Sequence, residues 1–273
     1  AETDNPVTPD KPMRLRSIAG VLEGLSPLRP SWQALVRFTA SYYQRSEGEG
    51  ALAALPPSLR ELSPVQLTRR LQRKAGSTKG KAKSIDTSHI HMPGPEALGT
   101  PPQGLALTTE QEVVLGQIEL QKGPFLLFGS TGSGKTEVYL RAAARVLAED
   151  PEAQVLVMVP EINLTPQLEE RFNTRFAAAL GAGAVVAMHS GMTPAQRLNS
   201  WLSAHTGQAR LVLGTRMAVL ASLPHLKLIV VDEEHDPSYK QQEGARYSAR
   251  DLAVLRGRLE HAQVLLGSAT PSL

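Results

Sequence analysis

A glycine-rich segment that ends in lysine and threonine has the residue types needed to hold phosphate. Its residues are Gly129, Ser130, Thr131, Gly132, Ser133, Gly134, Lys135 and Thr136. In a phosphate loop of this pattern, backbone N–H groups and the start of the following helix bind a polyphosphate, while the lysine reaches the β and γ phosphates. The hydroxyl of Thr136 can then bind Mg²⁺. The segment predicts a nucleotide site, and the alternative is a glycine-rich turn without a ligand.

Two adjacent acidic residues supply the second part of the expected chemistry. Asp232 and Glu233 directly follow an apolar run, so they lie where a buried strand would end. We expect Asp232 to bind Mg²⁺ through water and Glu233 to orient and deprotonate an attacking water molecule. Acids after a strand are by themselves more often part of a turn, but together with the phosphate loop they predict nucleotide hydrolysis. The predicted catalytic residues are Lys135, Glu233 and Asp232.

The next two residues, Glu234 and His235, are candidates for coupling the nucleotide site to a moving part of the protein. A structural histidine is nearly as good an explanation for His235.

Short apolar runs alternate with helical patterns from Leu105 onward, and these elements must position the loop and the acids. The apolar runs are 125–128, 155–159, 184–188, 211–213, 228–231 and 264–266. The helical patterns between them include 136–147, 166–179 and 194–203. Continuous apolar strands separated by helices predict an α/β fold with a mostly parallel sheet and helices on both faces. Ligands of such sheets bind at the carboxyl ends of the strands, where both motifs lie.

The residues before this region predict two further parts. Residues 13–56 carry a helical pattern with an aromatic stripe, in which Ser31 is the expected N-cap. Residues 57–104 are rich in Pro, Gly, Ser and Lys, so they predict a basic linker with one short helix near 63–74. Because no aromatic residue lies between Tyr43 and Phe125, we expect separate cores on the two sides. The predicted division of the chain is 1–56, 57–104 and 105–273.

Positive charge is concentrated in one tract. The chain of 273 residues has a formal net charge of only +3, yet seven basic residues and no acidic ones occupy 69–83. Outside this tract acidic residues outnumber basic ones, which excludes general binding of nucleic acid over the whole surface. The tract either binds a polyanion or is the solvated face of a helix that runs into a flexible linker.

The composition excludes several classes of protein. The sequence contains no cysteine, which excludes a disulfide scaffold, a thiol nucleophile and a Cys-ligated zinc site within these residues. It has no apolar run of membrane length and no signal-peptide pattern at its start. We therefore expect a cytoplasmic protein without a membrane partner.

The order of several short motifs resembles the superfamily 2 helicases and translocases. The Asp-Glu-Glu-His string at 232–235 follows a phosphate loop, as it does in that superfamily. Strings similar to its DNA- or RNA-contacting motifs are 159–161, 165–167 and 214–216. The string 267–270 resembles the motif that links hydrolysis to strand movement, and Gln111 resembles the residue that recognises adenine. Longer stretches resemble the primosomal protein N′ family of replication-restart helicases, namely 129–140, 159–167, 189–191 and 232–244.

This resemblance implies that 105–273 form a RecA-like phosphate-loop domain, the first motor lobe of an ATP-dependent 3′-to-5′ DNA helicase that uses Mg²⁺. It implies forked and single-stranded DNA as substrates. The implied partners are the single-stranded DNA-binding protein and the proteins of primosome assembly and helicase loading. Residues 1–56 would be a remnant of the family's amino-terminal DNA-binding region, and 57–104 a shortened winged-helix region if not a linker.

The resemblance also implies that a second motor lobe and a zinc site belong to a carboxy-terminal part beyond Leu273. Because the second lobe supplies an arginine to the nucleotide site, we expect these residues alone to hydrolyse ATP very weakly or not at all. A DNA-binding replication-restart scaffold without productive hydrolysis is the alternative function. A small-molecule kinase or another phosphate-loop transferase is a third alternative. Such an enzyme would need a substrate lid where this sequence has the strings 214–216 and 267–270.

A loop rich in aromatic and basic residues follows the acids at 236–250. Its interleaved side chains are Tyr239, Lys240, Arg246, Tyr247 and Arg250. Such a loop can stack nucleic-acid bases and bind phosphates. The alternative is a polar surface loop whose tyrosines cover the edge of the sheet.

Overall fold

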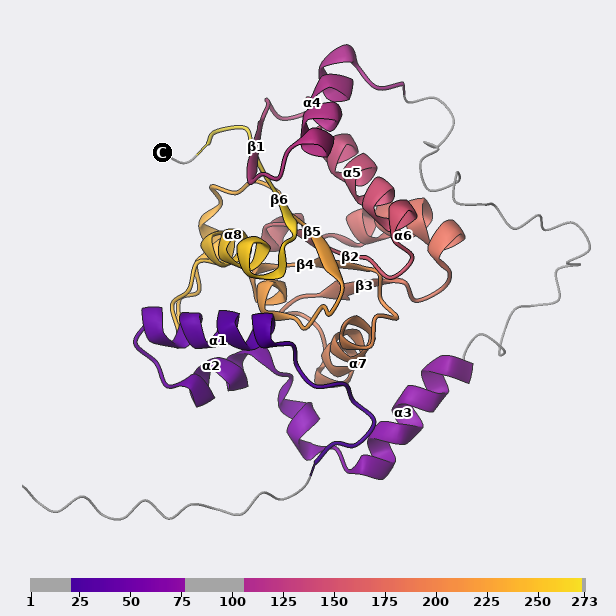
Figure 1. Ribbon diagram of the computed structural model, residues 1–273, viewed down its shortest axis with the longest axis vertical. Coiled ribbons are helices and arrows are strands. Elements are labelled where there is room, and N and C mark those ends of the chain that lie inside the picture. Colours follow the sequence, from indigo (N-terminus) through magenta and orange to yellow (C-terminus); the bar gives the residue numbers. More distant parts are fainter. Residues whose placement is uncertain (1–20, 77–105, 272–273) are drawn as a thin grey trace, which may run out of the picture.

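Within the described residues, 21–76 and 106–271, the computed structural model contains a six-stranded sheet in the order β1-β6-β5-β2-β4-β3 (Figure 1). The strands are β1 (Phe125–Phe128), β2 (Gln154–Met158), β3 (Val185–Met188), β4 (Leu211–Gly214), β5 (Leu226–Val231) and β6 (Gln263–Ser268). Neighbouring strands pair in parallel throughout. Each strand overlaps one of the predicted apolar runs, so the predicted α/β fold with a parallel sheet is confirmed.

Helices cover both faces of this sheet (Figure 1). They are α4 (Thr109–Leu120), α5 (Lys135–Glu149), α6 (Pro166–Leu180), α7 (Pro194–His205) and α8 (Ala249–Glu260). Alternate strand residues face opposite sides. Val157 therefore belongs to the core beneath α5 and α6, whereas its neighbour Leu156 belongs to the core beneath α7 and α8. Among the described residues, no helix is long and apolar enough to cross a membrane.

The amino-terminal helices pack against the sheet domain and share its core. They are α1 (Pro30–Tyr42), α2 (Glu47–Ala54), the 3₁₀ helix η1 (Pro57–Glu61) and α3 (Pro64–Gly76). α1 lies beside α8 (Figure 1), and the indole Nε1 of Trp32 donates to Leu220 O at 2.9 Å. Trp32 and Leu67 belong to the same buried cluster as Leu252 of α8. The expectation of separate cores is wrong, because aliphatic side chains such as Leu67 continue the core where aromatics are missing.

The start of α1 differs from the prediction. Pro30 is its first residue, and its N-cap is Arg29, whose side chain makes no capping hydrogen bond. The prediction of Ser31 as N-cap is therefore wrong. Proline suits the first helical position because the N–H that it lacks would have no partner in the helix.

The short helix predicted near 63–74 corresponds to α3. Its Arg70 donates to Asn199 Oδ1 of α7 at 3.1 Å, so this part of the basic tract contacts the sheet domain. The side chains of 73–74 and the whole of 77–83 lie outside the described residues. The alternatives for the basic tract therefore stay open.

His205 at the end of α7 contacts the segment that precedes α1. Its Nε2 lies 2.8 Å from Ser26 O, and its Nδ1 lies 2.9 Å from Ser222 Oγ. A carbonyl can only accept, so Nε2 carries the proton and Nδ1 accepts from the hydroxyl. Burial lowers the pKa of His205, and the hydrogen bond to Ser26 opposes this effect only in part. His205 is therefore neutral in the folded chain near pH 7.

The lowered pKa of His205 predicts a loss of stability in mild acid. As the pH falls below the ordinary histidine value of about 6.5, the unfolded chain binds a proton that the folded chain does not. The free energy of unfolding should therefore fall as the pH drops from about 7.5 through the ordinary histidine value of about 6.5. A His205→Gln variant, which cannot titrate, should lose less over the same interval in denaturant titrations. Equal losses in the two proteins would contradict this expectation.

Candidate nucleotide-binding site

The phosphate loop leads from β1 into α5 and needs glycine to do so. Gly132 and Gly134 have φ angles of +85° and +86°, and Gly134 is the N-cap of α5. A Cβ atom on Gly129 would lie 2.6 Å from Ser133 Oγ. The N–H of Gly129 donates to Ser268 O of β6 at 3.1 Å, which fixes the start of the loop. The loop thus curves around the N-terminus of α5, where backbone N–H groups attract anions.

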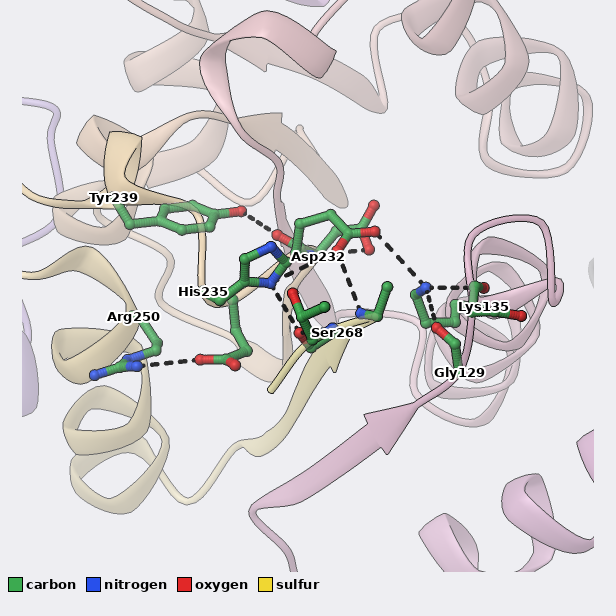
Figure 2. A network of polar contacts seen from close by, with 12 residues as sticks. Gly129, Lys135, Asp232, His235, Tyr239, Arg250 and Ser268 are labelled. Carbon is green, nitrogen blue, oxygen red and sulfur yellow. Dashed lines mark hydrogen bonds and ion pairs between the residues drawn. The ribbon is translucent and has the colours of Figure 1, made fainter. Parts of the chain in front are cut away.

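The ammonium group of Lys135 lies between this loop and the acids that follow β5 (Figure 2). Nζ donates to Gly129 O at 2.7 Å and to Ser130 O at 3.3 Å. The same atom lies 3.7 Å from Oε1 of Glu233, and only 8% of the Lys135 side chain is exposed. The structure therefore brings together two predicted residues that are far apart in the sequence.

Asp232 is held by hydrogen bonds from two tyrosine hydroxyls. Tyr139 of α5 donates to Oδ1 at 3.1 Å, and Tyr239 donates to the backbone carbonyl at 2.7 Å. Burial and the charge of Glu233 raise the pKa of Asp232, whereas the bond from Tyr139 and the charge of Lys135 act in the opposite direction. Burial, reinforced by Asp232, raises the pKa of Tyr139 far above its usual value, so Tyr139 remains a donor.

The end of β6 connects the acids to the string 267–270. The N–H of Ala269 donates to Glu233 Oε2 at 3.4 Å. Ser268 Oγ lies 2.8 Å from Nδ1 of His235 (Figure 2). Since β6 lies between β1 and β5 in the sheet, this segment contacts the start of the phosphate loop as well as the acids. A shift of 267–270 would therefore move the groups that orient Glu233.

The remaining predicted site residues surround the same loop. Gln111 forms a capping box with Thr108 at the start of α4, and its Nε2 donates to Ser133 O at 3.3 Å. Its contact with the loop is clear, while its recognition of adenine stays a prediction. Thr136 is half-buried in the first turn of α5, and Ser130 and Thr131 are exposed.

Tyr139 is a site residue that the sequence interpretation missed. It lies one helical turn after Lys135 on α5, so the two side chains share a face of the helix. Its ring is only 2% exposed, and a Cβ atom on Gly267 would collide with its hydroxyl. The spacing of four residues from Lys135 is the signal that could have identified it.

The tyrosines after the acids are buried. Tyr239 and Tyr247 are 2% and 6% exposed, and burial raises the pKa of Tyr247 to about 12. The interpretation of these two rings as a base-stacking surface is therefore wrong for this structure, and they cover the sheet instead. Arg250 pairs with the buried Glu234 at 3.1 Å, whereas Lys240 is exposed.

Two of the strings expected to contact nucleic acid, 159–161 and 214–216, meet beyond the carboxyl ends of β2 and β4. Glu161 follows β2 and lies 3.9 Å from Arg216, which follows β4. Glu161 also accepts a hydrogen bond from Ser190, which follows β3. Arg216 donates to Gln241 Oε1 at 2.8 Å and to Ser238 O at 3.1 Å. We refer to Glu161, Ser190 and Arg216 as the polar row.

The residues present fit a nucleoside triphosphate with Mg²⁺. The loop, which a Cβ atom on Gly129 would crowd, faces the buried ammonium group of Lys135, and the carboxylate of Glu233 lies 3.7 Å from that group. Among residues 21–76 and 106–271, no group of three or more His, Cys, Asp or Glu side chains could hold a metal. Mg²⁺ is commonly bound by one or two protein side chains together with substrate phosphates, so the predicted ligands Thr136 and Asp232 need no larger cluster of side chains. None of the predicted site residues lines the groove of about 840 Å³ between α4 and α5.

Removal of the Tyr139 hydroxyl should shift the pH dependence of hydrolysis. The sequence predicts that hydrolysis uses the carboxylate form of Asp232, and the pKa of this group is raised, so the rate should fall as the pH drops through a range above the ordinary Asp value of about 3.9. The bond from Tyr139 lowers this pKa, so Tyr139→Phe should lose activity at a higher pH than the unmodified protein. Profiles of kcat/KM against pH test this shift. If kcat/KM falls at the same pH in the two proteins, the expectation is refuted. The control is Tyr42→Phe, which removes an exposed hydroxyl.

A parallel sheet with a phosphate loop after one strand and paired acids after another is the arrangement of a phosphate-loop nucleotide-binding protein. Residues 108–272 match the DEAD/DEAH box helicase family. This match covers more than half of the chain, and the chain belongs to that family.

Two curated proteins illustrate the similarity. Replication restart protein PriA of Bacillus subtilis is 37% identical over 261 residues, 94% of this chain and 30% of that protein. PriA of Haemophilus influenzae is 45% identical over 171 residues, 62% of this chain and 22% of that protein. The chain thus spans less than a third of the length of these relatives. A crystal structure of the DUF1998 helicase MrfA is similar with a TM-score of 0.49 and 20% sequence identity, over 70% of this chain and 30% of that protein.

Proposed function

We propose that this chain contains the ATP-binding motor lobe of a DNA helicase that acts in replication restart. Support comes from the family membership, from the similarity to PriA and above all from the 3.7 Å between Lys135 Nζ and Glu233 Oε1. A cation that reaches the phosphates and a base for water are the central protein groups in triphosphate hydrolysis. The proposed cofactors are ATP and Mg²⁺, and the proposed catalytic residues are Lys135, Glu233 and Asp232.

Each side chain of the site has a proposed task. When bound, ATP with Mg²⁺ supplies the anhydride bond to be cleaved and a part of the charge neutralisation. Lys135 and the backbone N–H groups at the start of α5 bind the phosphates, and Thr136 and Asp232 hold the metal. Glu233 orients water and accepts its proton, while the N–H of Ala269 keeps the carboxylate oriented.

The substrates and partners of the whole protein are a further part of the proposal. The polar row follows β2, β3 and β4, of which β2 pairs with the strand before the acids, and it has the chemistry to contact a nucleic-acid backbone. By similarity to proteins named for replication restart, we propose forked and single-stranded DNA as substrates and 3′-to-5′ as the direction. The single-stranded DNA-binding protein and primosome-assembly proteins are the proposed partners. The division into 1–56, 57–104 and 105–273 belongs to the same proposal.

The test is ATP hydrolysis by the full-length gene product with and without forked DNA. We expect DNA-stimulated turnover that Lys135→Ala abolishes, because this substitution removes the ammonium group at the phosphate loop. Partial duplexes with a single-stranded 3′ or 5′ tail report the direction, and unwinding of the 5′-tailed substrate alone would contradict it. Tight fork binding without any hydrolysis would overturn the helicase proposal in favour of a DNA-binding scaffold.

A further inference from the structure

One oxygen of the Asp232 carboxylate accepts two hydrogen bonds. Its Oδ1 accepts from the hydroxyl of Tyr139 at 3.1 Å and from the backbone N–H of Glu233 at 3.1 Å. A carboxylate oxygen has two lone-pair positions, so these two donors occupy both positions of Oδ1. Oδ2 accepts no hydrogen bond from residues 21–76 and 106–271, and Asp232 is only half-buried. The side chain therefore has one oxygen left for a cation.

The hydroxyl of Tyr139 reaches Asp232 because position 267 is a glycine. A Cβ atom on Gly267 would overlap this hydroxyl and lie 2.7 Å from the ring carbon that bears it. Gly267 lies within β6, and its φ angle is not among the positive ones that would themselves require glycine. The missing side chain thus provides the space in which the hydroxyl lies.

The backbone of Asp232 is held independently of Tyr139. Its N–H donates to Met158 O of β2 at 2.9 Å, and its carbonyl accepts from the hydroxyl of Tyr239 at 2.7 Å (Figure 2). Loss of the Tyr139 hydroxyl should therefore free one lone pair of Oδ1 and leave the main chain of Asp232 in place.

We propose that Tyr139 is a positioning residue that selects Mg²⁺ over Ca²⁺ at Asp232 by leaving one carboxylate oxygen for the metal, and that Gly267 provides the space for its hydroxyl. The inference rests on the proposed function, in which Asp232 holds the metal of the nucleotide. One oxygen suits Mg²⁺, which keeps several of its water molecules and is held by few carboxylates. Ca²⁺ takes about six to eight oxygens and can bind both oxygens of one carboxylate. The bond from Tyr139 blocks this second contact.

The variants that test this selection are Tyr139→Phe and Gly267→Ala in the full-length gene product. Tyr139→Phe keeps the buried ring and removes the donor to Oδ1. Gly267→Ala keeps the hydroxyl but displaces it from its position. The control Tyr247→Phe removes a hydroxyl from another buried ring. The control Gly48→Ala adds a Cβ atom that meets nothing within 4 Å.

The readout is the binding of a fluorescent, non-hydrolysable ATP analogue while Mg²⁺ or Ca²⁺ is titrated without DNA. The ratio of the two half-saturating cation concentrations measures the preference for Mg²⁺. We expect both variants to lower this preference about tenfold, the size expected for one hydrogen bond to a charged group. The controls should keep it. A general defect in folding would weaken binding with both cations alike and leave the ratio unchanged.

An unchanged ratio in Tyr139→Phe would overturn the inference, whatever the result for Gly267→Ala. An unmodified protein without a preference for Mg²⁺ would overturn it as well. Failure of the unmodified protein to bind the analogue with either cation would instead overturn the proposed function, so the two failures are distinguishable.

The combination of Tyr139→Phe with Gly267→Ala tests whether both positions act through the same hydroxyl. If they do, the double variant has the same preference as Tyr139→Phe alone, because the hydroxyl that alanine would displace is already absent. Additive losses in the double variant would overturn the role assigned to Gly267.

Discussion

Replacement of Glu233 by glutamine is expected to lower the turnover number of DNA-stimulated ATP hydrolysis by about 10³ and to leave nucleotide affinity nearly unchanged. The amide has the size of the carboxylate, and its oxygen can still accept the N–H of Ala269. It cannot accept a proton from water. Lys135 keeps its bonds to the carbonyls of the phosphate loop, so the charge that binds phosphate remains.

Turnover and nucleotide affinity should be measured on the same preparations of the Glu233→Gln variant. Glu119→Gln is a matched control, because it removes one carboxylate from an exposed ion pair with Arg145 near the carboxyl ends of α4 and α5. Activity within about tenfold of the unmodified protein would exclude Glu233 as the base. Loss of nucleotide binding would instead indicate that Glu233 mainly positions Lys135, from which it is 3.7 Å away.

The sheet could be predicted from the sequence because its central strands are buried on both faces. Every side chain of β2 is buried, and in β5 only Lys227 is exposed, so both strands must be apolar almost throughout. Helix α8 has no counterpart among the predicted helical patterns. One reason is Arg256, whose side chain is fully buried. It donates to Val219 O and forms an ion pair with Glu260. A buried arginine looks like a surface residue in the sequence.

The approach of Lys135 to Glu233 could also be predicted, since both follow the carboxyl ends of strands in one parallel sheet. The partners of Asp232 could not. Tyr239 donates to a backbone carbonyl, and no residue type signals such an acceptor. From the sequence alone, Tyr239 is therefore interpreted as part of an exposed aromatic and basic loop. The structure shows that its side chain is buried. The contact of Tyr43 with Ser248 joins residues about 200 positions apart, so local patterns contain no trace of it.

Trp32 is expected to be the residue of the amino-terminal helices whose loss lowers stability most. Its side chain is 4% exposed, and its Nε1 donates to Leu220 O at 2.9 Å. Trp32→Ala removes packing between α1 and the sheet domain and leaves a buried carbonyl without its donor. The free energy of unfolding should fall by about 3–5 kcal/mol in denaturant titrations.

Phenylalanine substitutions separate the hydrogen bond of Trp32 from its packing. Trp32→Phe and Trp201→Phe remove the same volume from the core, but Nε1 of Trp201 has no hydrogen-bond partner among the described residues. Trp32→Phe should therefore lower the free energy of unfolding by about 1 kcal/mol more than Trp201→Phe. Equal losses would mean that the bond to Leu220 contributes nothing. If even Trp32→Ala costs less than about 1 kcal/mol, α1 does not pack on the sheet domain in solution.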